Sequence, residues 1–206
     1  MVTIVDYGVG NLGSILNMLK KVGAKAEASS DPDVLRRAEK LILPGVGAFD
    51  AGMHKLNESG LTPLLNELVL EKKIPVLGLC LGMQLMTRRS EEGAEAGLGW
   101  LAAETVRFRF GPEQAHLKIP HMGWNTLEVR RPHPLVADLG PEPRFYFVHS
   151  YHVVCADEAD VVAYTDYGHP VTAIVARDNL LGAQFHPEKS HKFGMQLLRN
   201  FVERIP

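Results

Sequence analysis

Cys80 lies in the segment Gly78-Leu-Cys-Leu-Gly, which carries the strongest chemical signal of the sequence. An apolar run precedes this segment and a helical pattern follows it, as in a nucleophile elbow with cysteine in place of serine. Glycines two residues to either side allow a sharp turn, and the N-terminus of the helix favours the thiolate. A buried structural cysteine between packing glycines is the alternative.

A histidine and a glutamate stand two positions apart near the C-terminus, in Phe185-His-Pro-Glu. On an extended chain both side chains point the same way, and Pro187 helps to keep the chain extended. Glu188 can then accept a hydrogen bond from one ring nitrogen of His186 and leave the other nitrogen as a base. Read alone, a surface turn explains this segment better. Together with Cys80, it predicts a Cys-His-Glu nucleophilic site.

The glycine-rich turn Pro44-Gly-Val-Gly also follows an apolar run. Backbone N–H groups of Gly45, Val46 and Gly47 can point at a developing oxyanion. The N–H of Leu81, directly after the nucleophile, is the other donor that such a site needs. An ordinary strand-to-helix turn is the alternative for this segment.

All three segments follow expected strands, so a sheet must position them. Apolar runs at 2–5, 24–28, 41–43 and 75–79 alternate with helical patterns at 12–22, 62–72 and 82–88. This alternation predicts an α/β fold with an open, mainly parallel sheet flanked by helices, as in flavodoxin-like proteins. Sheets of this kind place ligands at the carboxyl ends of their strands, which is where Cys80 and His186 are expected.

The second half of the chain predicts an additional, antiparallel β portion. Strands are expected over 104–110, 126–129, 145–148, 152–155, 161–165, 171–176 and 181–185, and an amphipathic helix from Phe193 onward. Segments 91–99 and 130–144 are expected to be exposed loops. Because no linker or repeat interrupts the 206 residues, we expect one domain over 1–206.

Composition excludes several classes of protein. Lys plus Arg number 22 against 24 Asp plus Glu, and no basic block stands out, so nucleic acid is disfavoured as the main ligand. Two cysteines are too few for a disulfide framework, which favours a reducing cytoplasm. No uncharged stretch reaches the roughly 20 residues of a membrane helix, so no membrane partner is expected.

Two further patterns are weaker. Gly8-Val-Gly-Asn-Leu-Gly matches the dinucleotide-binding fingerprint literally. The β-rich second half does not supply the second mononucleotide-binding half, so we expect no cofactor. His149 and His152 would face opposite ways in one strand, and no cluster has ligand spacing, so no metal is expected.

Six motifs occur in order and cover nearly the whole chain: Asp6-Tyr-Gly-Val-Gly-Asn-Leu, Pro44-Gly-Val-Gly-Ala-Phe, Gly78-Leu-Cys-Leu-Gly-Met-Gln, Pro120-His-Met-Gly-Trp-Asn, Tyr146-Phe-Val-His-Ser-Tyr and Gln184-Phe-His-Pro-Glu-Lys-Ser. On these motifs the chain resembles the class I (triad) glutamine amidotransferases. Within them, it is most similar to the family of glutaminase subunits of imidazole glycerol phosphate synthases. The resemblance departs from the family pattern at no catalytic position.

This resemblance implies an enzyme of histidine biosynthesis with two subunits. The glutaminase would hydrolyse glutamine to glutamate and ammonia through a thioester on Cys80. A (β/α)8-barrel cyclase subunit would use the ammonia to make imidazole glycerol phosphate and an aminoimidazole carboxamide ribotide. The resemblance also implies that glutamine hydrolysis is nearly idle until the cyclase and its nucleotide bind.

Individual residues take roles by the same resemblance. Residues that would hold the substrate glutamine are Gly47, Gln84, Glu92, Ser150 and Tyr151. Residues on the side that faces the cyclase would be Gly10, Asn11, Trp124, Tyr146 and Lys189. Without the resemblance, Trp124 and Tyr146 would be read as core residues, and Gln84, Ser150 and Tyr151 as ordinary helix and strand residues.

Other functions stay open at this point. The same triad suits the glutaminase of another synthase, such as pyridoxal phosphate synthase. It also suits a stand-alone γ-glutamyl hydrolase, which needs no partner. A catalytically inactive binding subunit with this fold is a further alternative, disfavoured by the intact Cys80, His186 and Glu188.

Overall fold

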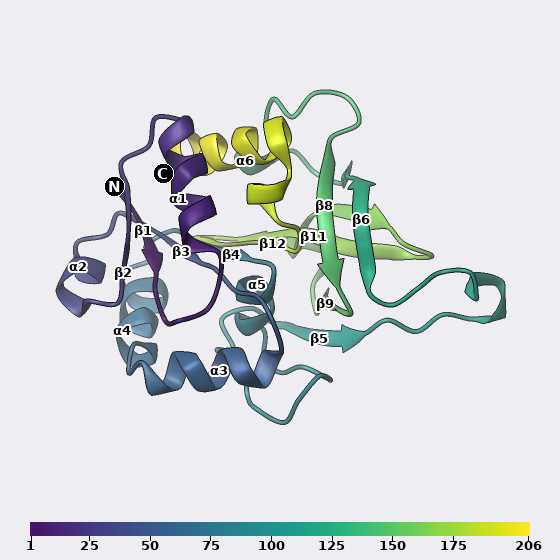
Figure 1. Cartoon of the computed structure of the whole chain (residues 1–206), viewed down its shortest axis with the longest axis horizontal. Coiled ribbons are helices and arrows are strands. Elements are labelled where there is room, and N and C mark those ends of the chain that lie inside the picture. Colours follow the sequence, from purple (N-terminus) through teal and green to yellow (C-terminus); the bar gives the residue numbers. More distant parts are fainter.

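An eight-stranded sheet forms the centre of the structure, a computed structural model that describes residues 1–206 (Figure 1). Five neighbouring strands run parallel, in the order β2 (Ala26–Ser29), β1 (Val2–Val5), β3 (Lys40–Leu43), β4 (Val76–Leu79) and β12 (Leu180–Ala183). Antiparallel strands β11 (Pro170–Arg177), β10 (Val161–Asp166) and β7 (Glu128–Val129) complete the sheet. The predicted mainly parallel α/β fold is therefore confirmed.

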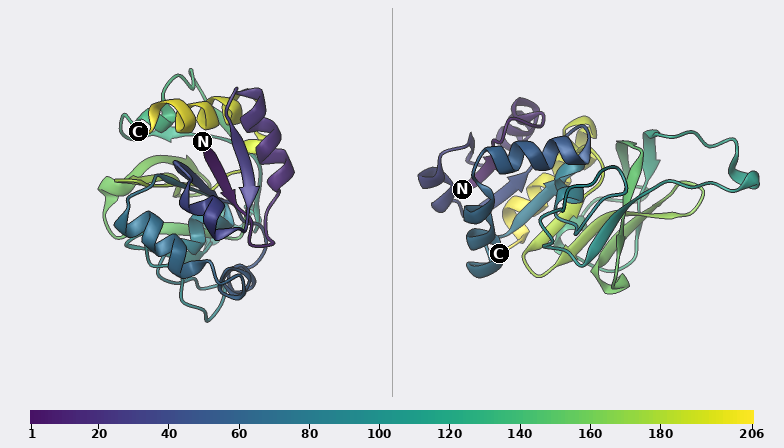
Figure 2. Two further views of the ribbon diagram at one scale, coloured as in Figure 1. Left: turned by 90° about the vertical axis from the view of Figure 1, so that its left-hand side faces the viewer. Right: turned by 90° about the horizontal axis from the view of Figure 1, so that it is seen from below.

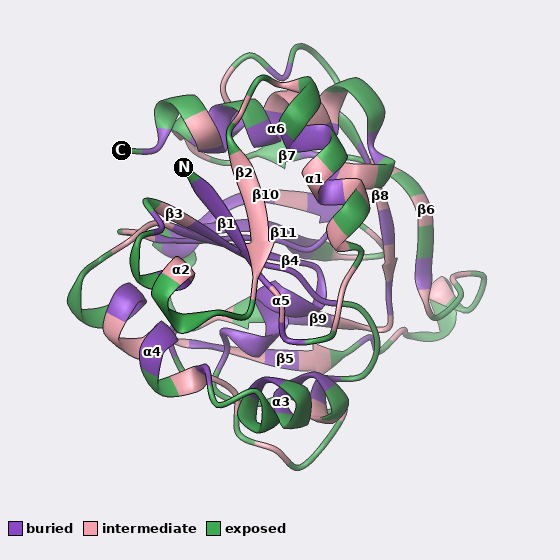
Figure 3. Ribbon diagram, turned by 60° about the vertical axis from the view of Figure 1, so that its left-hand side comes forward, coloured by how far each residue is buried: buried purple, intermediate pink, exposed green.

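Helices cover both faces of this sheet, which leaves two separate apolar cores. On one face, α1 (Leu12–Lys21) and α6 (His191–Arg204) lie side by side and bury residues such as Leu19 and Phe201 (Figure 1). The other face carries α2 (Pro32–Arg36), α3 (Phe49–Glu58), α4 (Thr62–Asn66) and α5 (Leu81–Leu85). Between the cores, β1 is buried throughout, whereas the edge strand β2 is half-buried (Figure 3).

Local sequence explains most element ends. Asp31 caps α2 by accepting a hydrogen bond from the backbone N–H of Asp33, and Pro32 stands at the first helical position. Gly23, in the left-handed region at φ +81°, follows the last turn of α1. Lys40 donates to the carbonyls of Phe201 and Val202 and so closes the C-terminal end of α6.

Two antiparallel ribbons extend from one side of the sheet (Figure 2). One ribbon pairs β5 (Ala103–Arg107) with β9 (Tyr151–Cys155), and the other pairs β6 (His121–Thr126) with β8 (Arg144–His149). Only Ser150 separates β8 from β9, although the two strands belong to different ribbons. The chain therefore breaks sharply at Ser150, and this break lies beside the candidate site.

Several predicted elements differ from those in the structure. Helix α3 and strand β6 were not expected. The strand expected over 126–129 is divided, because Thr126 ends β6 and β7 begins only at Glu128. The helix expected over 62–72 consists of α4 followed by a π-helical segment, Glu67–Glu71.

Two predictions about the second half are wrong in part. Segment 130–144 is not simply an exposed loop, because Leu135, Val136 and Leu139 are buried in the core below α6. His149 and His152 do not face opposite ways. The break at Ser150 resets the alternation, and both rings pack against Phe108, at centroid distances of 5.3 and 4.8 Å.

No helix combines the length and the apolar character needed to span a bilayer.

Candidate active site

Cys80 occupies the turn between β4 and α5, with a backbone φ of 52° and ψ of −110°. This left-handed φ is strained for a residue with a side chain, as expected of a nucleophile elbow. Neighbouring glycines make the turn possible. A Cβ atom on Gly82 would lie 1.9 Å from the carbonyl oxygen of Leu43, and one on Gly78 would lie 2.6 Å from the sulfur of Met86. The turn places the Cys80 sulfur at the carboxyl end of the sheet.

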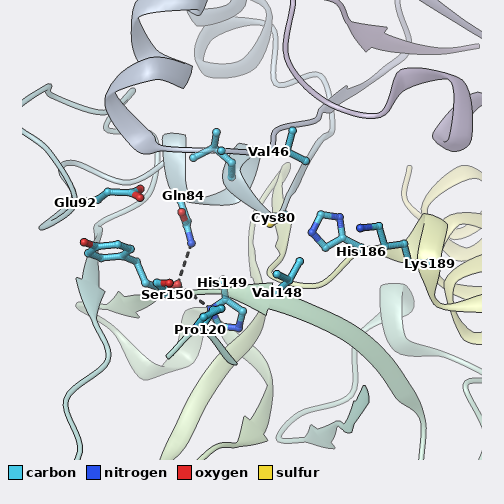
Figure 4. A pocket seen from close by; sticks show the side chains of 13 residues that line it. Val46, Cys80, Gln84, Glu92, Pro120, Val148, His149, Ser150, His186 and Lys189 are labelled. Carbon is cyan, nitrogen blue, oxygen red and sulfur yellow. Dashed lines mark hydrogen bonds between the residues drawn. The ribbon is translucent and has the colours of Figure 1, made fainter. Parts of the chain in front are cut away.

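His186 follows β12, the strand next to β4, and lies beside Cys80 (Figure 4). Its Nδ1 is 2.9 Å from Oε1 of Glu188, and both side chains are buried. Burial lowers the pKa of His186, but hydrogen bonds with Cys80 and Glu188 outweigh burial and raise it to about 9. The three residues therefore form a buried chain in which the His186 ring lies between the Cys80 sulfur and the Glu188 carboxylate.

The backbone around His186 is held by β8 and by Ser190, the residue before α6. Its N–H donates to the carbonyl of Tyr146, at 2.9 Å, and its own carbonyl accepts from the Ser190 hydroxyl, at 2.6 Å. The same hydroxyl accepts from the N–H of Tyr146, at 3.0 Å. These bonds fix the segment that carries both His186 and Glu188.

Two buried glutamine side chains connect Cys80 to the ribbons. Gln184 donates to the sulfur of Cys80 across 3.9 Å. Gln84 donates through Nε2 to Oε1 of Gln184 and to the carbonyl of Tyr151, both at 3.0 Å. Gln84 was predicted from the resemblance, whereas Gln184 was missed although it opens the motif that contains His186.

The turn after β3 lies against α5 and approaches the nucleophile. Tyr7, two residues after the end of β1, donates to the carbonyl of Pro44 at 2.6 Å, and a Cβ atom on Gly45 would lie 2.8 Å from the Leu81 side chain. Gly47 adopts φ +97°, a conformation that favours glycine. Val46, Gly47 and Leu81 line the cavity, whereas Gly45 does not.

A cavity of about 370 Å³ opens above Cys80 (Figure 4). All five residues predicted to hold glutamine line it: Gly47, Gln84, Glu92, Ser150 and Tyr151. Lys189, predicted for the partner interface, lines it too. The sequence reasoning missed three lining residues, Pro120, Val148 and His149, although all three stand within the motifs that carry the resemblance.

Glu92 joins the cavity to helix α3. Its Oε2 accepts from the N–H of Phe49 at 2.8 Å, and the residue before Phe49 provides no side-chain cap. A carboxylate at a helix N-terminus satisfies a free N–H and the helix dipole. Glu92 therefore stabilises α3 and the turn at Gly47 while it faces the cavity.

Residues predicted to face the cyclase gather beside the cavity. Trp124 is 47% exposed, its ring lies 6.2 Å from that of Tyr146, and Lys189 places its ammonium 5.6 Å from the Tyr146 ring centroid. Reading Trp124 as a core residue would be wrong. Gly10 packs against Pro44, and Asn11 caps α1 by accepting from Ser14, so the literal glycine fingerprint is the β1–α1 turn.

Cys155, the second cysteine, is not part of the Cys-His-Glu arrangement. It lies at the end of β9 and does not line the cavity above Cys80. Burial, together with Asp160 and Asp157, raises its pKa to about 12. A thiol of this kind stays protonated and inert at neutral pH.

Comparisons with known proteins agree with this geometry. The model of the family "Glutamine amidotransferase class-I" matches residues 3–205. The chain is 55% identical to "Imidazole glycerol phosphate synthase subunit HisH 2" of Pseudomonas aeruginosa, over all of both chains. It is 47% identical to "Imidazole glycerol phosphate synthase subunit HisH" of Leptospira interrogans, over 98% of this chain and 99% of the relative.

Solved structures resemble the fold. One, described as "Crystal structure of glutamine amidotransferase", superposes with a TM-score of 0.76 at 23% identity, over 98% of both chains. Another, "Structure of PurLQS from Thermotoga maritima", gives a TM-score of 0.75 at 19% identity, over 100% of this chain and 98% of that one. At these identities the likeness concerns the fold alone.

Proposed function

Because this chain belongs to the class I glutamine amidotransferases, we propose that it is the glutaminase subunit of an imidazole glycerol phosphate synthase. It hydrolyses glutamine to glutamate and ammonia, and residues 1–206 act as one amidotransferase domain. The single observation that carries the chemistry is the buried chain of Cys80, His186 and Glu188, of which Cys80 and His186 line the cavity. A reducing cytoplasm would keep Cys80 as a thiol.

Cys80 attacks the side-chain amide carbon of glutamine as a thiolate. His186 takes the thiol proton and returns it to the departing nitrogen, which leaves as ammonia. A water molecule then attacks the thioester carbon, again with His186 as base, and glutamate leaves with Cys80 restored to a thiol. Glu188 holds the ring of His186 and stabilises its charged form.

The tetrahedral oxyanion lies between two backbone segments. Leu81 is the first residue of α5, so its N–H has no acceptor within the helix. The facing donor comes from the turn of Gly45, Val46 and Gly47, two of which line the cavity. One oxyanion donor is worth about 3 kcal/mol, so the conformation of this turn can set the rate.

The substrate lies across the cavity from Cys80 toward the break at Ser150. Gln84 uses its amide nitrogen on Tyr151 and Gln184, which leaves its oxygen to accept from an N–H of glutamine. Glu92 faces the same space, and its carboxylate suits the substrate's ammonium group. Ser150, Tyr151 and Gly47 complete the glutamine site.

The partner is the cyclase subunit, which receives the ammonia. Ammonia that reaches water becomes ammonium and is lost as a nucleophile, so a partner must cover the cavity. We place that interface at Gly10, Asn11, Trp124, Tyr146 and Lys189. Its support is the exposure of Trp124 and of Met122, at 47% and 61%, on one strand beside the cavity.

Glutamate release in three states tests this function: the chain alone, with the cyclase, and with the cyclase plus its nucleotide. We expect a low basal rate that rises steeply only in the third state. A high rate that ignores the cyclase would point instead to a stand-alone γ-glutamyl hydrolase or the glutaminase of another synthase. No release in any state would contradict glutaminase activity itself.

A further inference from the structure

Two buried histidines form a hydrogen-bonded chain that ends in the cavity wall. His149 Nδ1 lies 2.8 Å from the carbonyl oxygen of Tyr151. The other ring nitrogen of His149, Nε2, lies 3.1 Å from Nδ1 of His121. Asn125 Nδ2 lies 3.3 Å from Nε2 of His121 and closes the chain at its far end. None of these three side chains has a part in the hydrolysis described above.

The partners at the two ends decide which nitrogens carry hydrogen. The Tyr151 carbonyl can only accept, so His149 carries its proton on Nδ1 and accepts through Nε2. His121 must then donate from Nδ1 and accept through Nε2. Both rings are therefore in the Nδ1–H tautomer.

Asn125 has one orientation that satisfies its neighbours. Its Nδ2 donates to the carbonyl of Asp166 at 2.7 Å, and its Oδ1 accepts from the N–H of Thr126 at 2.9 Å. The amide nitrogen therefore points to His121, and the direction of the whole chain is fixed.

Two hydrogen bonds converge on the Tyr151 carbonyl, one from His149 and one from Gln84 (Figure 4). That carbonyl stands directly after the break at Ser150, where the strand leaves one ribbon for the other. A misdirected carbonyl would release the Gln84 amide, whose remaining N–H bond goes to Gln184. The two hydrogen-bonded histidines thus help to orient the Tyr151 carbonyl and, through it, the Gln84 amide.

We propose that His149 and His121 are positioning residues, which hold the Tyr151 carbonyl and through it the Gln84 amide in the orientation that binds glutamine. The proposal rests on the proposed glutaminase function. Burial supports it, since it lowers the pKa of His121 to about 4 and, with His121 nearby, that of His149 to about 3. Both rings stay neutral at pH 7, as a chain with one donor and one acceptor per ring requires.

His152 provides a matched control. It is as buried as His149, at 7% exposed, and packs on the same Phe108 ring. Its Nδ1 has no hydrogen-bond partner. The His152 ring does not belong to the hydrogen-bonded chain of His149, His121 and Asn125, and it does not line the cavity. Replacing His152 therefore reports the cost of losing a buried ring alone.

The first test is nitrogen NMR of the wild-type chain labelled with ¹⁵N-histidine, assigned with single His→Asn variants. We expect Nδ1–H tautomers for His121 and His149. An Nε2–H tautomer at His149 would overturn the proposal, because its bond to the Tyr151 carbonyl would then be impossible. This test does not depend on activity, so it stands even if the glutaminase assignment fails.

The second test is glutaminase kinetics in the complex with the cyclase and its nucleotide. His149→Leu should raise KM for glutamine about tenfold and change kcat far less, because it misdirects a binding group. His149→Asn keeps a donor near the position of Nδ1 and should recover most of the lost affinity. His121→Leu should raise KM by a smaller factor.

His152→Leu should lower the thermal midpoint and leave KM unchanged. Equal effects of His149→Leu and His152→Leu on KM would overturn the proposal, and so would a failure of His149→Asn to recover affinity. Either result would show that His149 contributes only packing. If His149→Leu does not fold, the proposal is still tested by KM of His149→Asn relative to wild type and by the tautomers that NMR reports. An inactive wild-type complex would instead contradict the proposed function.

Discussion

His186, at the carboxyl end of β12 in the large sheet, and the three histidines of the ribbons are all at most 7% exposed, yet their pKa values move in opposite directions. For His121, His149 and His152, burial is the largest influence, and it lowers their pKa to about 4, 3 and 4. His186 is subject to the same burial, but Cys80 and Glu188 raise its pKa to about 9. Partner chemistry, rather than depth, decides whether a buried histidine is charged.

The sheet and the ribbons also contribute different groups to the proposed reaction. In the proposed function, the carboxyl ends of β4 and β12 carry the groups that make and break bonds, whereas the break between the ribbons carries groups that hold the substrate. Variants at the sheet edge should therefore lower kcat, and variants at the ribbons should raise KM. A ribbon variant that abolished kcat at saturating glutamine would break this division.

The largest effect is expected for Cys80→Ala. Without the nucleophile no thioester forms, and kcat of the assembled enzyme should fall by about 10⁴-fold or more, measured as glutamate release. Cys155→Ala is the control and should stay within about twofold of wild type, since a lone replacement away from the site has little effect. A loss of activity in both variants would point to misfolding.

Glu188→Gln should lower kcat by about 10²- to 10⁴-fold. The His186 imidazolium would lose the carboxylate that stabilises it, and the His186 ring would no longer be held in one tautomer. KM for glutamine should change little, since Glu188 does not line the cavity. A change in KM without a change in kcat would show that Glu188 acts in glutamine binding, and it would contradict the expected separation between kcat effects at the sheet and KM effects at the ribbons.

Gly82→Ala tests the turn that positions the nucleophile. Its new methyl group would overlap the Leu43 carbonyl, and we expect a loss of about 3 kcal/mol in the free energy of unfolding. Gly13→Ala is the matched control in helix α1, where nothing lies within 4 Å of the new Cβ atom. It should be neutral or stabilise by up to about 1 kcal/mol. Urea unfolding of both variants would decide.

The alkaline limb of the stability profile follows from His186. Because its pKa is raised above the unfolded value near 6.5, its stabilisation is complete below pH 6.5 and is lost as the pH rises through about 9. Unfolding in urea should show a decline of up to about 3 kcal/mol over that range. Glu188→Gln should make this decline smaller without removing it, because Cys80 also raises the pKa of His186. An unchanged slope would contradict the contribution of Glu188 to the charged His186.

The acid limb follows from the ribbons and has the opposite sign. His121, His149 and His152 have lowered pKa values, so their contribution is complete above pH 6.5 and is lost as the pH falls toward about 4. His121→Leu should make the chain less sensitive to acid over this range than wild type. An equal slope would show that carboxylates alone set the acid limb.

Sequence reasoning succeeded where local signals and spacing agree. The parallel strands are short apolar runs between turns. The pattern around Cys80 and the strand before His186 already placed these two residues at the carboxyl ends of strands, and the spacing permitted a bond between His186 and Glu188. Helix α3 escaped because its N-terminal cap comes from Glu92, 43 residues away in the chain. The local sequence around Phe49 gives no sign of a capping residue so distant in the chain.

The ribbons were harder to predict for a related reason. Strand β6 reads His-Met-Gly-Trp-Asn-Thr, with a glycine inside and apolar residues facing outward, so the usual alternation is inverted. The break at Ser150 depends on which strands pair, and pairing is a tertiary property. The opposite-facing arrangement expected of His149 and His152 was wrong for that reason, and the histidine chain could not be seen.

The most direct test of the central claim is mass spectrometry of the assembled enzyme after treatment with a chloroketone analogue of glutamine. The account predicts a single adduct, on Cys80, that forms together with loss of glutamate release and is blocked by excess glutamine. Cys155, with its pKa raised to about 12, should stay unmodified. Labelling of Cys155 in place of Cys80, or full glutamine turnover in Cys80→Ala, would contradict the assignment of Cys80 as the nucleophile.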